Sequence, residues 1–71
     1  MPYVNIKVTR EDVTREQKAR LIAGVTDLLV DVLDKDPATT VVVIEEIEIE
    51  NWGIAGVQTD IYRARRKAGA V

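Results

Sequence analysis

The chain begins with the eight residues Met1-Pro2-Tyr3-Val4-Asn5-Ile6-Lys7-Val8. The apolar residues at positions 4, 6 and 8 alternate with polar residues at 5, 7 and 9, which is the period of a strand with one buried face. Pro2 shares the parity of the apolar set, and a proline at the first position of a strand removes no ladder hydrogen bond. This opening predicts a strand that starts directly after Pro2.

A long amphipathic helix is predicted next. Thr14 is followed three residues later by Gln17, which is the capping-box signature of a helix start. Apolar residues then recur at spacings of three and four over about five turns and predict a core-facing stripe: Leu21, Ile22, Val25, Leu28, Leu29, Val32 and Leu33. Polar and charged residues lie off this stripe: Glu16, Lys18, Arg20, Asp27 and Asp31. Pro37 ends the helix because proline disfavours helical geometry in the residue before it, and residues 36–39 predict one short capped turn.

A second strand is predicted from Val41, where an unbroken β-branched run passes into the alternation Ile47-Glu48-Ile49-Glu50. A strand, a helix of about 18 residues and another strand form a βαβ unit with parallel strands. A helix on one face leaves the other face open. We therefore expect another copy of the chain to complete the sheet.

The remainder predicts a small C-terminal unit. Residues 51–56, Asn-Trp-Gly-Ile-Ala-Gly, predict a tight turn or hairpin. Residues 57–62 form either a third short strand or an arm that reaches onto a neighbour. The fold class is therefore α/β (α+β), with a single βαβ unit and a C-terminal hairpin in one domain, residues 1–71.

Charge is unevenly distributed along the chain. An acidic run at 45–50 and a basic tail at 63–67 either pair between subunits or form solvated faces. The basic tail lacks interleaved aromatic residues beyond Tyr62, which argues against nucleic-acid binding.

The composition excludes several classes of protein. The 71 residues contain no cysteine and no histidine, so thiol chemistry and histidine-based zinc sites are excluded. A chain this short buries only about 60% of its unfolded surface, which favours self-association. The sequence has no apolar run long enough to span a membrane and no basic region before an apolar core, so we expect a cytoplasmic protein that does not bind membranes.

Pro2 is the candidate catalytic residue. Removal of Met1 would leave Pro2 with a free secondary amine, and an α-amino group titrates near ~7.7–8.0. Burial among apolar groups or nearby cations would favour the neutral amine, which is then a general base at pH 7. With Met1 attached, the Pro2 nitrogen is an amide without basicity.

Four segments together resemble the 4-oxalocrotonate tautomerase family, small βαβ subunits with an amino-terminal proline. These are Pro2, Glu16-Gln17-Lys18, Pro37-Ala38-Thr39-Thr40 and residues 51–56, in this order along nearly the whole chain. The resemblance implies a hexamer built as a trimer of dimers. It also implies that Pro2 moves a proton between atoms of a small 2-oxo or 2-hydroxy acid, with no metal or organic cofactor.

The resemblance also bears on substrate binding. Trp52 matches an aromatic position that makes the pocket wall apolar, and it is equally well interpreted as a packing residue at a subunit contact. Well-known members bind substrate carboxylates with two arginines, but Val13 and residues 41–42 occupy the matching places here. Arg10 and Arg15 flank the first place, and Arg10 is the better candidate for a carboxylate ligand. Loss of the second arginine favours a monocarboxylate over a dicarboxylate substrate.

We thus predict a tautomerase with Pro2 as acid and base, and with Arg10 and Trp52 in contact with the substrate. The partners are a small carboxylic acid and other copies of the chain, as a dimer or a hexamer, or a homologous subunit. Two alternatives remain. One is a hydratase or dehalogenase of the same superfamily, and the other is a non-catalytic or partner-dependent subunit.

Overall fold

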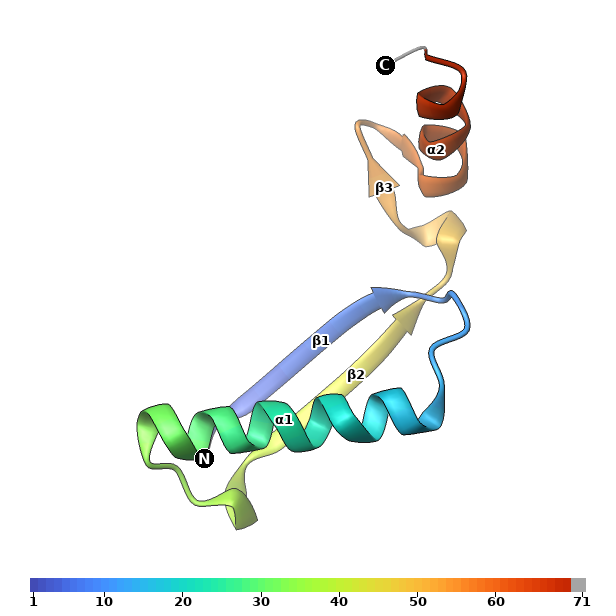
Figure 1. Ribbon diagram of the computed structural model, residues 1–71. Coiled ribbons are helices and arrows are strands. Elements are labelled where there is room, and N and C mark those ends of the chain that lie inside the picture. Colours follow the sequence, from blue (N-terminus) through green and yellow to red (C-terminus); the bar gives the residue numbers. More distant parts are fainter. Residues whose placement is uncertain (70–71) are drawn as a thin grey trace.

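The computed structural model describes residues 1–69. Its elements, in chain order, are β1 (Tyr3–Thr9), α1 (Arg15–Leu33), η1 (Pro37–Thr39), β2 (Val41–Ile47), η2 (Ile49–Asn51), β3 (Gly53–Ile54), β4 (Val57–Gln58) and α2 (Thr59–Lys67). Figure 1 shows β1 and β2 side by side with α1 across them, while β3, β4 and α2 stand apart at the far end. Positions 70–71 of the predicted domain lie outside the described residues.

The two long strands pair in parallel, as the sequence predicts. Tyr3 faces Val41 at one end of the ladder and Thr9 faces Ile47 at the other. Because side chains alternate, the residues at 4, 6 and 8 share a face with those at 42, 44 and 46. α1 lies on that face, since Lys18 of the helix binds Glu46 of β2. The predicted βαβ unit is therefore confirmed.

The predicted capping box sets the start of α1. The Thr14 hydroxyl accepts a hydrogen bond from the Gln17 backbone N–H at 3.1 Å, and the Gln17 side-chain oxygen accepts from the Thr14 N–H at 2.9 Å. Asp34 ends the helix in the left-handed conformation with φ 53°. The short turn η1 follows, with the Asp36 carboxylate accepting from the Ala38 N–H at 2.9 Å.

The predicted C-terminal hairpin forms around a two-residue turn. β3 and β4 pair in antiparallel fashion, and the residues between them, Ala55 and Gly56, both have positive φ, 54° and 84°. Two consecutive positive φ values define the type I′ turn, whose twist matches that of paired strands. Glycine adopts this backbone freely, whereas alanine does so at a cost.

The segment after the hairpin differs from the prediction. Only Val57 and Gln58 are strand, and the chain then enters α2. Asp60 in the first turn and three basic residues in the last turn complement the helix dipole, which favours a helix here. Thr59 fixes the start, since its backbone N–H and its hydroxyl both donate to the Trp52 carbonyl, at 3.0 and 2.6 Å.

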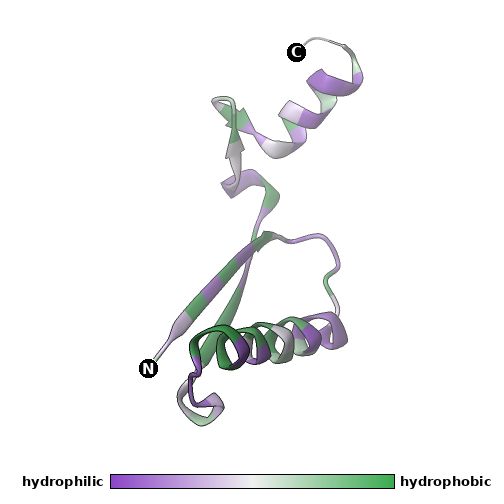
Figure 2. Ribbon diagram, turned by 60° about the vertical axis from the view of Figure 1, so that its left-hand side comes forward, coloured by the Kyte–Doolittle hydropathy of each residue, from purple (hydrophilic) through white to green (hydrophobic). Residues whose placement is uncertain are grey.

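The predicted core does not close within one chain. No apolar side chain in residues 1–69 is fully buried, and Thr59 is the one residue of this part that is, at 1% exposure. Of the predicted α1 stripe, Val25 and Leu29 are half-buried, whereas Leu28 and Val32 are 58% and 66% exposed. Apolar side chains therefore lie on the outside of the subunit. Figure 2 shows hydrophobic stretches along α1 and along the two long strands.

The subunit is long for its size. Its radius of gyration is 16.3 Å, and its extents are 48 × 22 × 18 Å. A compact chain of this length would have a radius of gyration of about 11 Å. The difference reflects the C-terminal arm, defined here as residues 53–67, which extends away from the βαβ unit (Figure 1). None of the helices in residues 1–69 is long and apolar enough to cross a bilayer.

Candidate active site

Pro2 lies at the start of the parallel ladder. Its carbonyl accepts a hydrogen bond from the Val41 N–H at 3.0 Å, which ties the residue to the first position of β2. Pro2 is half-buried, whereas Met1 before it is 93% exposed. This hydrogen bond fixes the backbone of Pro2 at the start of the ladder, directly after the exposed Met1.

Arg10 lies at the opposite end of the same ladder, where its N–H donates to the Ile47 carbonyl at 2.8 Å. Its side chain is 55% exposed, and its guanidinium lies beside two carboxylates of the same chain. The Nε atom lies 2.5 Å from Glu48, and Nη1 lies 3.8 Å from Glu46. A substrate carboxylate at Arg10 would compete with both.

Trp52 is half-buried and follows η2, so it also lies beyond the end of β2. Its carbonyl receives the two hydrogen bonds from Thr59 that begin α2. The backbone of Trp52 is therefore held by the arm, independently of its indole ring.

The three predicted site residues do not meet within one chain. Pro2 lies at the start of the ladder, and Arg10 and Trp52 lie beyond its end. Eight residues of extended strand separate Pro2 from Arg10 by about 26 Å. A site that contains all three requires more than one chain.

Two glutamates of the acidic run, Glu45 and Glu46 on β2, are paired with cations of the same chain. Lys7 binds Glu45 at 3.2 Å on the open face of the sheet, and Lys18 binds Glu46 on the helix face. The hydrogen bond from Lys18 is the main cause that lowers the pKa of Glu46. For Glu45, the amide of Asn5 contributes most and Lys7 next, and both lower its pKa. These carboxylates are therefore ionised, weakly basic groups.

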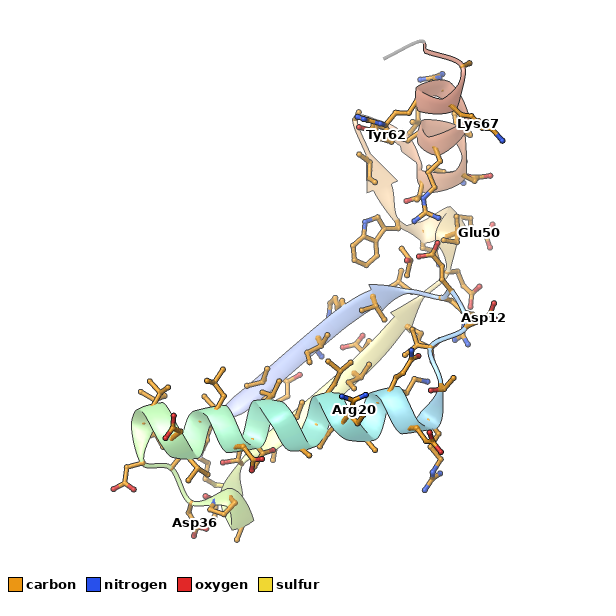
Figure 3. All side chains as sticks on the ribbon, viewed as in Figure 1. Asp12, Arg20, Asp36, Glu50, Tyr62 and Lys67 are labelled. Atoms are coloured by element: carbon orange, nitrogen blue, oxygen red, sulfur yellow. The ribbon has the colours of Figure 1, made fainter. Side chains whose placement is uncertain are left out.

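A hollow opens on the surface at the first turns of α1. Val13, Gln17, Arg20 and Leu21 line it. Figure 3 labels Arg20 on the first half of α1. In the sequence, Arg20 stands out only as a polar residue off the apolar stripe of α1. The spacing in the sequence could have predicted that Arg20 lies beside Gln17 and Leu21, since positions 17, 20 and 21 fall on one side of a helix.

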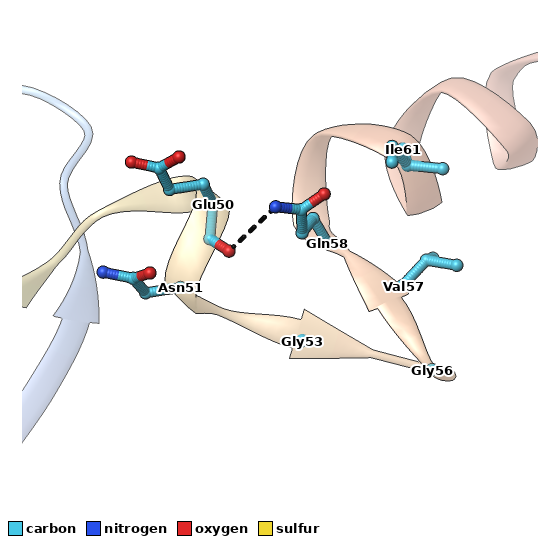
Figure 4. A pocket seen from close by; sticks show the side chains of 7 residues that line it. All are labelled: Glu50, Asn51, Gly53, Gly56, Val57, Gln58 and Ile61. Atoms are coloured by element: carbon cyan, nitrogen blue, oxygen red, sulfur yellow. Dashed lines mark hydrogen bonds between the residues drawn. The ribbon is translucent and has the colours of Figure 1, made fainter.

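A second hollow lies at the base of the arm, between η2, the hairpin and α2 (Figure 4). Glu50, Asn51, Gln58 and Ile61 line it together with residues of the hairpin. Within this lining, the Gln58 amide donates to the Glu50 carbonyl at 3.2 Å (Figure 4). The Gln58 amide, which lines this hollow, therefore holds the hairpin against η2.

No cluster of three or more acidic side chains suited to a metal ion occurs in the described part of the chain. The side chains around the first hollow are instead hydrogen-bond donors and apolar groups. The chemistry that such an arrangement supports is binding of an anion with an apolar body.

Comparison with known proteins identifies the family. Residues 2–60 match the family described as Tautomerase enzyme. "Probable tautomerase K2" of Dickeya dadantii (strain 3937) is 66% identical over 56 residues, which cover 79% of this chain and 84% of that protein.

Solved structures agree with this assignment. The crystal structure of DmpI from Helicobacter pylori matches with a TM-score of 0.82 at 43% identity, over 89% of this chain and 97% of that one. A structure from the study of 4-oxalocrotonate tautomerase isozymes of Methylibium petroleiphilum matches with a TM-score of 0.75 at 32% identity, over 83% and 94%. The chain belongs to the tautomerase family, a family of isomerases, and has the fold of the 4-oxalocrotonate tautomerases.

Proposed function

We propose that the protein is a keto–enol tautomerase that acts on a small unsaturated 2-oxo or 2-hydroxy acid, with Pro2 as its acid and base after Met1 is removed. The observation that carries the proposal is the placement of Pro2. Its carbonyl is held at the start of the ladder by Val41, while the exposed Met1 is open to removal. Membership of the tautomerase family supports the type of reaction.

In the proposed reaction, the neutral Pro2 nitrogen takes a proton from the enol hydroxyl or from the carbon beside the carbonyl. The electron pair released from the O–H or C–H bond moves through the conjugated system. The resulting prolinium then gives its proton to another carbon of the same molecule. No atom is gained or lost, and the base returns to its starting state, so the reaction needs no cofactor.

The proposal requires an apolar wall near the Pro2 nitrogen, because desolvation keeps an amine neutral. Trp52 is the candidate for this wall. Since Trp52 lies beyond the far end of β2, about 20 Å from the start of the strand, it would come from another copy of the chain. The exposed apolar residues of α1 and β2 support assembly of several copies.

Arg10 remains a predicted ligand of the substrate carboxylate. To act in this way, the Arg10 guanidinium would have to release Glu48 or bind Glu48 and the substrate carboxylate together, since Arg10 Nε and the Glu48 carboxylate are 2.5 Å apart. Backbone N–H groups would stabilise the charge that develops on the substrate oxygen.

The hydratase alternative receives less support. Activation of water requires a carboxylate with a free lone pair and enough basicity. Glu45, Glu46 and Glu48 are each bound to a lysine or an arginine of the same chain. The exposed apolar surface suits a homo-oligomer and a partner-dependent subunit equally, and the mass of the purified assembly distinguishes them.

The test combines intact mass with activity. We expect mass spectrometry to show loss of Met1, and we expect the protein to convert phenylenolpyruvate to its keto form. Pro2→Ala keeps an amino terminus but replaces the secondary amine, and it should lower kcat/KM by about 10²-fold or more. Retention of Met1 in active protein, or equal rates for the two proteins, would remove Pro2 from the mechanism.

A further inference from the structure

We infer that Thr59 is a positioning residue for the proposed reaction. By binding the Trp52 carbonyl, its hydroxyl fixes the direction in which the indole ring leaves the backbone, and so keeps the apolar wall in place. The inference rests on the proposed function, in which Trp52 shields the Pro2 nitrogen of another copy. It gives a role to the one side chain of residues 1–69 that is fully buried.

Thr59 is buried where the rest of the described chain is not. Its exposure is 1%, although it begins a helix of nine residues in an arm that extends away from the βαβ unit (Figure 1). Its backbone N–H and its hydroxyl both donate to the Trp52 carbonyl, at 3.0 and 2.6 Å. A carbonyl oxygen has two lone pairs, so these two bonds satisfy it. A buried polar contact with every group satisfied holds its partner in one geometry.

Both polar groups of the Trp52 backbone are held, and by different elements. Its N–H donates to the Ile49 carbonyl of η2 at 3.2 Å, and its carbonyl accepts from Thr59 of α2. Trp52 therefore spans the joint between η2 and the arm, with φ −109° and ψ 107°. These two angles are the soft torsions of its backbone. They set how the Cα–Cβ bond is directed relative to η2 on one side and the hairpin on the other.

The residue after Trp52 makes the carbonyl contact important. Gly53 follows, and glycine has the widest choice of backbone conformations, so the peptide between the two residues is poorly restrained by local sterics. The amide of Gln58 also holds the hairpin against η2, through the Glu50 carbonyl at 3.2 Å, but that bond is exposed to water. The bond from the Thr59 hydroxyl is the part-buried one, and it acts on the Trp52 carbonyl directly.

A restrained ring is what the proposed wall requires. The wall has to exclude water from the Pro2 nitrogen before substrate arrives, because desolvation is what keeps the free amine neutral. Trp52 is only half-buried in its own subunit, so packing within one chain leaves part of the ring uncovered. A ring that is directed through its backbone is preorganised, and less conformational entropy is lost when the site forms.

The first experiment follows the ring itself. Trp52 is the one tryptophan of the 71 residues, so emission excited where tyrosine does not absorb reports this ring alone. Thr59→Val removes the hydroxyl but keeps the shape of the side chain and the backbone N–H. Acrylamide should quench the Trp52 emission of this variant about twofold more strongly than that of wild type, because the ring moves more freely. Thr59→Ser keeps the donor and should be quenched like wild type.

Thr26→Val is the matched control. The Thr26 hydroxyl also donates to a backbone carbonyl, that of Ile22 at 2.7 Å, but it does so inside α1. Its quenching and its activity should equal those of wild type. Circular dichroism and light scattering check the helices and the mass of each assembly. Where Thr59→Val fails to assemble, Thr59→Ala, which also lacks the donor, is measured under the same criteria. Wild-type quenching in the folded variant would overturn the inference, whatever its activity.

The second experiment connects the ring to the reaction through the pH dependence of phenylenolpyruvate turnover. In Thr59→Val, the ascending limb of kcat/KM should move up toward the free-amine value, and kcat/KM at pH 6 should fall about threefold or more. Thr59→Ser should restore both. In a Trp52→Ala background, Thr59→Val should cause no further shift of the limb, since the ring through which Thr59 acts is absent.

Two outcomes of this second experiment would overturn the inference and leave the proposed function intact. One is an unchanged ascending limb in folded Thr59→Val. The other is an equal shift with and without the Trp52 ring, which would mean that Thr59 affects turnover by another route. Full activity of Pro2→Ala is a different result, since it would overturn the proposed function and, with it, the role of Thr59 in the reaction.

Discussion

Arg63 of α2 donates a hydrogen bond to the carboxylate of Glu11 in the connection between β1 and α1. Within residues 1–69, this is the one ion pair that joins the C-terminal arm to the βαβ unit. The Thr9 hydroxyl donates to the same carboxylate. The contact spans 52 positions of sequence, so it fixes the arm to a part of the chain that is distant in sequence.

Protonation of Glu11 should release the arm. The hydrogen bonds from Arg63 and then Thr9 lower the pKa of Glu11 to about 2. The unfolded or released state has a glutamate pKa near ~4.3 and binds more protons between these two values. The contact therefore stabilises the arm fully above about pH 4.3 and is lost as the pH falls toward 2. The protection factors of the α2 amides, which are corrected for the intrinsic pH dependence of exchange, should fall across this window.

Glu11→Gln provides the control for this titration. It keeps the size of the side chain but cannot ionise. The α2 amides should therefore be less protected from exchange than in wild type at pH 7, and their protection factors should not change further down to pH 3. An unchanged α2 exchange rate in Glu11→Gln at pH 7 would show that this pair does not hold the arm.

The pH dependence of turnover should report a desolvated Pro2 amine. Removal of water from the charged form lowers the pKa of an amine, so the ascending limb of kcat/KM should lie below ~7.7–8.0. Phenylenolpyruvate turnover from pH 4 to 9 measures it. An ascending limb at the value of a free α-amino group would mean that the nitrogen is solvated.

Trp52 should determine the pH at which the ascending limb of kcat/KM lies. Trp52→Ala lets water reach the site, so the ascending limb should move up toward the free-amine value, and kcat/KM should fall about tenfold or more at pH 6. Trp52→Phe keeps an apolar wall and should stay near wild type. Because the bonds of Thr59 go to the backbone of Trp52, both variants should retain α2, which circular dichroism checks. The same ascending limb in wild type and both variants would mean that the Trp52 ring has only a packing role.

Thr14 should stabilise α1 through the capping box. Thr14→Ala removes the acceptor of the Gln17 N–H and should lower the free energy of unfolding by about 1 kcal/mol, measured in urea at fixed protein concentration. Thr26→Ala is the matched control. The Thr26 hydroxyl donates to the Ile22 carbonyl inside the helix, where alanine has the higher helix propensity, so this variant should be as stable as wild type or slightly more so. Equal losses in both variants would contradict a specific capping effect.

Leu28 should be needed for assembly. Its side chain is 58% exposed in one subunit and lies in line with Leu21 and Val32 on α1. Leu28→Lys should reduce the mass of the particle measured by light scattering and lower activity more than about tenfold, since the proposed site needs several copies. Asp27→Lys places the same charge on the polar side of the helix and should leave the mass unchanged. A wild-type mass for Leu28→Lys would mean that this surface stays open.

The sequence predicted those parts of the fold that depend on local chemistry. The capping box at Thr14 and Gln17, the end of α1 before Pro37 and the parallel pairing of β1 with β2 follow from hydrogen-bonding signatures and apolar period. The hairpin followed from the glycines at 53 and 56, of which Gly56 has a positive φ.

The helix α2 escaped prediction because it has only nine residues and few of them are apolar, too few for a recognisable apolar stripe. The features of the sequence that favour this helix are electrostatic, with Asp60 in its first turn and basic residues in its last turn. Its first residue, Thr59, is held by a hydrogen bond to the Trp52 carbonyl. The candidate site was predictable residue by residue but not as an arrangement. Pro2 and Trp52 are named by resemblance, whereas their separation along β2 is a property of the ladder.

Without a shielded apolar interior, each copy has little free energy of its own to oppose the entropy of the unfolded chain. In the proposed assembly, folding and association form one equilibrium governed by mass action, so the melting temperature should rise with protein concentration. Dilution should unfold the chain instead of releasing folded single copies. Newly synthesised chains would thus become resistant to proteolysis only after they associate with other copies of the chain.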